Sequence, residues 1–188
     1  KRLIYAWHPE EVVGILGIPK ALPEHRALTS LALRPDGEVV ATGNEDALLR
    51  TFSVASGANT RRIFGHQGKV AALAFAPDGQ TLASIGVEGA LKLWHPGDLS
   101  LKAAADRQSQ ALTGLAYHPT GKWLAASCLD GKVRVYDGAA KLHKTYDPGD
   151  GPIHSLAFTP DGHFLFWSAE NGLVRWVQTH GPLVRSQV

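Results

Sequence analysis

Histidine is the residue type in this sequence that most invites a metal-binding or catalytic interpretation. The 188 residues include nine histidines and one cysteine, Cys128. A zinc site needs three or four ligands that converge on one point. His154 lies at the start of an apolar run, and the aligned positions of three similar runs hold the small side chains of Thr29, Ala71 and Thr113. We therefore expect neither a metal nor a cofactor, and we interpret His154 as a solvent-facing or partner-contacting residue.

The motifs of common catalytic sites are absent from the sequence. It contains no Gly-x-Ser-x-Gly nucleophile elbow, no phosphate-binding loop and no Cys-x-x-Cys-His haem attachment. The paired carboxylates Glu10-Glu11 and Glu45-Asp46 are adjacent in the sequence, which is typical of loops and turns. A formal net charge of +2, with both signs interspersed, predicts neither a nucleic acid nor a membrane as partner. We predict that the chain is not an enzyme.

The elements that must position any functional side chain come from a short block that occurs four times. The copies are Leu31-Ala32-Leu33 with Pro35-Asp36-Gly37, Leu73-Ala74-Phe75 with Pro77-Asp78-Gly79, Leu115-Ala116-Tyr117 with Pro119-Thr120-Gly121, and Leu156-Ala157-Phe158 with Pro160-Asp161-Gly162. Successive prolines of these blocks are 42, 42 and 41 residues apart. A period of about 40 to 45 residues indicates a stacked array of one supersecondary unit.

Each copy predicts a four-stranded antiparallel sheet. In the second copy, Leu73 and Phe75 lie on one face of an inner strand, and Pro77-Asp78-Gly79 reverses the chain. Glu88-Gly89 marks the next hairpin, and Leu91-Lys92-Leu93-Trp94 reads as the third strand, followed by a variable outer segment. Such a sheet cannot bury both of its apolar faces alone, so neighbouring sheets must cover it. We predict an all-β protein, a β-propeller with about four blades present as part of a larger ring.

These residues carry a resemblance to a known family. Gly65-His66, Ser84, Glu88 and Trp94 resemble the motifs of WD-repeat (WD40) proteins, and Pro-Asp-Gly-Gln-Thr-Leu-Ala-Ser looks like the repeats of bacterial members. The resemblance implies a structural hydrogen-bond network of His66, Ser84, Glu88 and Trp94 inside one blade. The other repeats depart from it. They hold Glu24, Gln108 and Gly149 at the histidine position and Thr42, Ala126 and Trp167 at the serine position.

The borders of the blades follow from aligning the repeats. Residues 1–24 are expected to form the last two strands of a preceding blade, because Ile4-Tyr5-Ala6-Trp7-His8-Pro9 is similar to Leu91-Lys92-Leu93-Trp94-His95-Pro96. Residues 25–65, 66–107, 108–148 and 149–188 are the predicted blades, with a candidate outer strand of the last one near Leu183-Val184. The chain begins at Lys1 and has no methionine, so we expect it to be a fragment without its natural N-terminus. Two copies completing one ring are the alternative.

The resemblance implies a non-catalytic scaffold that presents its propeller face and loops to a protein or peptide. The family's preferred contact surface maps onto eight residues: Thr29, Glu45, Lys69, Val87, Thr113, Leu129, His154 and Glu170. The alternative is the propeller portion of a larger enzyme or of a redox or signalling protein. Self-association through exposed blade faces also remains open. A single cysteine is compatible with a reducing, cytoplasmic compartment, although the sequence names no location.

Six further residues carry interpretations. A basic residue recurs on the third expected strand of each repeat, at Arg50, Lys92, Arg134 and Arg175. We interpret it as a side chain that lies on apolar surface with its charge in water, rather than as an anion-binding stripe. Two interpretations stay open for Trp123 and Trp167: each is either an exposed binding anchor or a side chain that fills space inside the blade.

Overall fold

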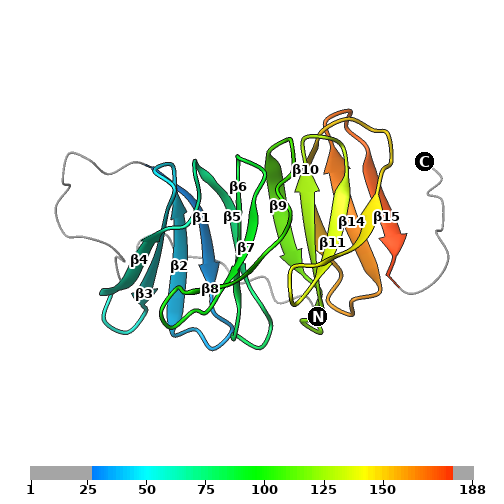
Figure 1. The fold of residues 1–188 in the computed structure, drawn as a ribbon. Coiled ribbons are helices and arrows are strands. Elements are labelled where there is room, and N and C mark those ends of the chain that lie inside the picture. Colours follow the sequence, from blue (N-terminus) through cyan, green and yellow to red (C-terminus); the bar gives the residue numbers. More distant parts are fainter. Residues whose placement is uncertain (1–26, 180–188) are drawn as a thin grey trace, which may run out of the picture.

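The computed structural model describes residues 27–179, which form fifteen strands in four antiparallel sheets standing side by side (Figure 1). The first sheet holds β1 (Leu28–Leu33), β2 (Val39–Asn44), β3 (Leu48–Ser53) and β4 (Asn59–Phe64). The second holds β5 (Val70–Phe75), β6 (Leu82–Gly86), β7 (Leu91–Trp94) and β8 (Leu101–Ala104). The third holds β9 (Leu112–Tyr117), β10 (Trp123–Cys128), β11 (Val133–Asp137) and β12 (Leu142–Tyr146). The fourth holds β13 (Ile153–Phe158), β14 (Phe164–Ala169) and β15 (Val174–Gln178).

This architecture confirms the all-β propeller class, with about four blades present. Within residues 27–179 every regular element is a strand, and each sheet is a simple meander in sequence order. The strands expected in residues 1–24 and near Leu183-Val184 lie outside the described residues. The turn after each inner strand follows its local chemistry: Gly79 takes a φ of 69°, in the left-handed region that glycine adopts at low cost.

One irregularity repeats in every sheet. The pairing between the first and second strands shifts register near the start of the inner strand, so that one residue is left without a partner across the ladder. The bypassed residues are Thr29, Ala71, Thr113 and His154. A β-bulge of this kind re-aims the side chain of the extra residue. Position, rather than residue type, is therefore what these four side chains share.

The core of the molecule lies between the sheets. Leu73 and Phe75 of β5 pack against Ala41 and Leu49 of the first sheet, and all four are at most 8% exposed. Equivalent clusters fill the second and third interfaces. Alanine recurs at one second-strand position, where Ala41, Ala83 and Ala125 are 1%, 0% and 0% exposed, so the next inner strand can approach closely.

The two end faces of the array contrast with these interfaces. Leu28, Leu31 and Leu33 of β1 are 62%, 64% and 54% exposed. The aligned residues of β5, which are Val70, Leu73 and Phe75, are 0%, 8% and 8% exposed. The first sheet thus presents, among the described residues, the apolar face that every later sheet buries.

Candidate functional site

The eight candidate contact residues gather at one end of the array. At this end the start of each inner strand meets the turn between the second and third strands. One backbone hydrogen bond joins the two segments in every sheet. The four bonds are Glu45 N to Ala27 O (3.1 Å), Val87 N to Lys69 O (3.0 Å), Leu129 N to Ala111 O (3.0 Å) and Glu170 N to Pro152 O (2.9 Å). We call this end, with its four turns and four strand starts, the rim.

The turn residues of the rim point outward. Val87 and Leu129 are 41% and 37% exposed, and Glu45 and Glu170 are exposed as well. Lys69 is exposed beside Val87. The rim therefore offers carboxylates on the first and fourth sheets and apolar side chains on the second and third.

Two of the predicted contact residues have another task. The Thr29 hydroxyl donates to Val70 O of the second sheet at 2.6 Å, and the Thr113 hydroxyl donates to Ile153 O of the fourth sheet at 2.5 Å. Both side chains leave a bulge and tie one sheet to the next. Their hydroxyl protons are therefore committed inside the protein, and sequence reasoning missed this role because the bulge leaves no residue pattern of its own. His154 holds the same position on the fourth sheet and is exposed.

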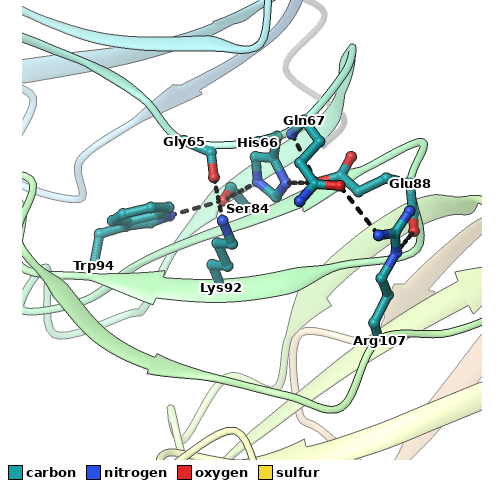
Figure 2. Close-up of polar contacts among 8 residues, drawn as sticks. All are labelled: Gly65, His66, Gln67, Ser84, Glu88, Lys92, Trp94 and Arg107. Carbon is teal, nitrogen blue, oxygen red and sulfur yellow. Dashed lines mark hydrogen bonds and ion pairs between the residues drawn. The ribbon is translucent and has the colours of Figure 1, made fainter.

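The four residues of the expected structural network meet inside the second sheet (Figure 2). His66 Nε2 lies 2.6 Å from Ser84 Oγ, and His66 Nδ1 lies 2.6 Å from Glu88 Oε1. Trp94 Nε1 donates to Ser84 Oγ at 2.8 Å. The side chain of His66 is fully buried and that of Glu88 is 8% exposed.

One proton arrangement accounts for all three contacts of this network. Trp94 donates to the Ser84 oxygen, Ser84 donates to His66 Nε2, and His66 Nδ1–H donates to Glu88 Oε1. A neutral imidazole is required. Burial, aided by the charge of Lys92, lowers the pKa of His66 below its ordinary value of 6.5, although Glu88 opposes the shift. Electrostatics and hydrogen bonding therefore favour the same protonation state.

Close neighbours hold the network in place. Lys92 Nζ donates to Gly65 O at 2.6 Å, and Arg107 Nε donates to Glu88 O at 2.6 Å (Figure 2). A Cβ atom at Gly86 would lie 2.5 Å from His66 Nδ1 and would overlap the Glu88 carboxylate. Only glycine fits at that point. The network is a packed structural unit, and its buried atoms are closed to a substrate.

The basic residues of the third strands correct an expectation. Their charges do not lie free in water but reach acids or a carbonyl of the same sheet. Arg134 bonds both carboxylate oxygens of Asp130, Arg175 bonds both of Asp150, and Arg50 lies 3.6 Å from Asp46. The Arg134 side chain is only 10% exposed. These contacts use the charges internally, so they form no anion-binding stripe.

The two tryptophans left open by the sequence take different positions. Trp167 is 4% exposed and belongs to the core between the third and fourth sheets. Trp123 is half-buried at the border of the same core. Trp167 therefore fills space, whereas Trp123 keeps a surface that another molecule can touch.

The described residues show no centre for metal chemistry. Within residues 27–179 no group of three or more His, Cys, Asp or Glu side chains is arranged to hold a metal ion. Burial raises the pKa of the Cys128 thiol, which makes it a poor nucleophile. The described part of the chain contains no helix that could cross a membrane.

Comparison with known proteins identifies the class to which this fold and its network belong. Residues 18–53, 57–95 and 103–137 match the family described as WD domain, G-beta repeat. Because these matches cover more than half of the sequence, the chain belongs to the WD-repeat family. Proteins of this family generally act as non-catalytic scaffolds that bind other proteins.

A curated relative and two solved structures resemble the chain. Periodic tryptophan protein 2 homolog from Dictyostelium discoideum is 34% identical over 117 residues, which are 61% of this chain and 13% of that protein. A relative from Dictyostelium discoideum gives no support to the expectation that the repeats are of a bacterial type. The crystal structure of the computationally designed Ika4 protein superposes with a TM-score of 0.74 at 24% identity, over 84% of this chain and 95% of that chain. The designed Ika8 protein gives 0.72 at 24% identity, over 81% of this chain and 46% of that chain. At this identity the two structures show the fold alone.

Proposed function

We propose that the chain is an interaction scaffold whose rim binds a protein or peptide. The observation that carries this proposal is the repeated backbone bond, which holds four outward-facing turn residues on four packed sheets. A rigid surface loses little conformational entropy on binding. The partner face consists of Glu45, Lys69, Val87, Leu129, His154 and Glu170, and Thr29 and Thr113 support it from below through their inter-sheet bonds.

The charged and apolar residues of this face follow a fixed order from the first sheet to the fourth. The first and fourth sheets contribute Glu45 and Glu170, and the second contributes Lys69 beside the apolar Val87. A partner with an apolar centre and basic flanks would complement this order. Exposed charges at an interface govern specificity and association rate more than affinity. No reaction is proposed.

Peptide selection tests the proposal. Phage-displayed peptides are selected on the immobilised chain and then measured against the variant carrying Glu45→Ala, Lys69→Ala, His154→Ala and Glu170→Ala. We expect the selected peptides to bind the variant about tenfold more weakly, with an unchanged melting temperature. Glu38→Ala removes an exposed charge at the opposite end of the first sheet and is the matched control. Equal binding to the wild-type chain and the fourfold variant would place the contact surface elsewhere.

We further propose that the end faces support association between copies. Leu28, Leu31 and Leu33 are the open half of an interface that the chain builds three times internally. The opposite end presents Phe166 where the inner sheets have Ala41, Ala83 and Ala125, and Phe166 clusters with Phe164 and Trp176. The four sheets also correspond to a little under half of the Ika8 chain, as half of a ring would.

Sedimentation tests this association. The wild-type chain should sediment as a dimer at micromolar concentration, and the variant Leu31→Asp with Leu33→Asp should sediment as a monomer. Val54→Asp, at an exposed apolar residue outside β1, should leave the dimer intact. A monomeric wild-type chain over the whole concentration range contradicts the proposal.

A further inference from the structure

A cavity opens between the third and fourth sheets at the end of the array opposite to the rim. Its volume is about 260 Å³. Trp123 stands at the start of β10, Lys144 and Tyr146 lie on β12, and Phe158 ends β13. Because the inner strands start at the rim and run away from it, Phe158 lies away from the rim, and none of the eight rim residues lines the cavity. It is a separate site.

Aromatic rings and cations form the walls of the cavity. Trp123 stacks on His143 with 4.2 Å between ring centroids. Lys122 Nζ lies 5.1 Å from the centre of the Trp123 ring, and Lys144 Nζ lies 4.8 Å from that of Tyr146. None of the residues that line the cavity is acidic, and neither lysine forms a salt bridge within residues 27–179. An anionic group could therefore approach both ammonium groups without displacing a carboxylate of this part of the protein.

At this cavity the third sheet carries larger side chains than the second sheet has at the same positions. By strand pairing, Trp123, Lys144 and Tyr146 correspond to Thr81, Ala103 and Ala105 of the second sheet. Ala103 and Ala105 pack against the core between the second and third sheets. The third sheet thus carries a tryptophan, a tyrosine and a lysine at positions where the second sheet has one threonine and two alanines. Trp123 and Tyr146 pack at the border of the core between the third and fourth sheets, and both stay half-buried and line the cavity.

Size and strand exposure define the kind of ligand. Pockets for drug-sized ligands are usually about 300–1,000 Å³, so this cavity suits a single large side chain. It adjoins β12, which is the edge strand of its sheet and has Leu142 to Thr145 exposed. An extended peptide fits beside such an edge, and its alternate side chains point the same way about 7 Å apart.

We propose that this cavity binds an extended acidic peptide segment. One aromatic or aliphatic side chain of the peptide enters between Trp123 and Tyr146. Carboxylates two residues before and after it pair with Lys122 and Lys144. The lysines then exchange a cation–π contact for a salt bridge at the mouth of the cavity. This interaction is independent of the rim and of its partner.

The test uses a fluorescein-labelled peptide, Ser-Glu-Ser-Phe-Ser-Glu-Ser, and its fluorescence anisotropy with the whole chain. We expect saturable binding that weakens with added salt. Replacing both glutamates by glutamine, or the phenylalanine by alanine, should weaken binding about tenfold. Trp123→Thr and Lys144→Ala should do the same, and each installs the residue of the second sheet, so folding is tolerated. Melting curves verify that tolerance.

The controls separate this site from general charge attraction. Lys141→Ala removes a charge from the same hairpin outside the cavity and should change the affinity less than twofold. The fourfold rim variant should bind the acidic peptide normally. The proposal is overturned if no saturable binding occurs, if Trp123→Thr has no effect, or if Lys141→Ala weakens binding as much as Lys144→Ala does.

Discussion

The second and third sheets keep an acid at the same turn but satisfy it in different ways. In the second sheet the acid is Glu88, which accepts a hydrogen bond from the Nδ1–H of His66 in a neighbouring loop. In the third sheet it is Asp130, which is bonded by Arg134 from the adjacent strand. The aligned serine and tryptophan of the second sheet, Ser84 and Trp94, become Ala126 and Tyr136.

Side-chain length explains the difference. Asp130 Oδ1 accepts from the N–H of Lys132, two residues further on, in a local turn bond. Asp46 and Asn171 make the same local bond in the first and fourth sheets. Glu88 is one methylene longer and instead bonds the N–H of Gln67 together with His66. The longer acid therefore joins distant segments, whereas the shorter acids close their own turns and leave an arginine to neutralise them.

Removing the histidine of the second sheet should have the largest effect. His66→Leu leaves the nearly buried Glu88 carboxylate without its main donor and Ser84 without an acceptor. We expect a loss of about 3 kcal/mol in the free energy of unfolding. Urea denaturation followed by tryptophan fluorescence measures it. His163→Leu, at an exposed histidine, should change stability by less than about 0.5 kcal/mol. A similar small change for His66→Leu would mean that the network contributes little.

Removing the arginine of the third sheet should cost less. Burial acts to raise the pKa of Asp130, but the hydrogen bonds from Arg134 and the Lys132 N–H outweigh it and hold that pKa below its usual range. The Asp130 side chain is 18% exposed, so water can partly replace the arginine. We expect Arg134→Met to cost about 1.5 kcal/mol near neutral pH.

Acid titration identifies the source of that loss. A lowered folded-state pKa stabilises the protein above the unfolded value of 3.8, and this stabilisation disappears as the pH falls through the folded pKa. The difference between wild type and Arg134→Met should therefore shrink in acid. Arg50→Met is the matched control, since Arg50 lies 3.6 Å from its acid and should matter less. An equal or larger loss for Arg50→Met contradicts the assigned strength of the Arg134 pair.

The histidine network of the second sheet should give stability a pH dependence near neutral pH. Because the pKa of His66 is lowered in the folded state, the unfolded chain binds a proton first as the pH falls below about 6.5. Stability should therefore be full above that pH and decrease below it, by at most about 1.4 kcal/mol per pH unit. Urea denaturation between pH 7.5 and 5 measures the slope. His66→Gln should flatten it, and an unchanged slope would assign the titration to another group.

Much of the fold could be predicted from the sequence because its signals are local. A proline and a glycine define each inner turn, with an aspartate between them in three of the four copies, and period-two patterning defines the strands. The network of His66, Ser84, Glu88 and Trp94 is implied by the resemblance of one repeat to the WD-repeat family. The pairing of Arg134 with Asp130 could not be predicted, because it depends on how the side chain of a β11 residue folds back to the turn between β10 and β11. The inter-sheet bonds of Thr29 and Thr113 depend on a bulge, and the cavity beside Trp123 depends on two separate sheets, so repeat alignment reveals neither.

The smallest expected effect is that of removing the hydroxyl of Tyr136, whose counterpart in the second sheet is the indole of Trp94. Trp94 Nε1 donates to Ser84, whereas the Tyr136 hydroxyl is buried with no hydrogen-bond partner among the described residues. Burial raises the pKa of Tyr136 to about 12, so this hydroxyl stays protonated and carries an unused donor. A buried polar group without a partner costs stability, and removing it recovers part of that cost. Tyr136→Phe should therefore stabilise the protein by about 0.5–1 kcal/mol, while Trp94→Phe should destabilise it by about 2 kcal/mol. Thermal denaturation of both variants measures the two signs. Destabilisation by Tyr136→Phe would mean that the third sheet has a polar network of its own, in which the hydroxyl contributes as the indole of Trp94 does in the second.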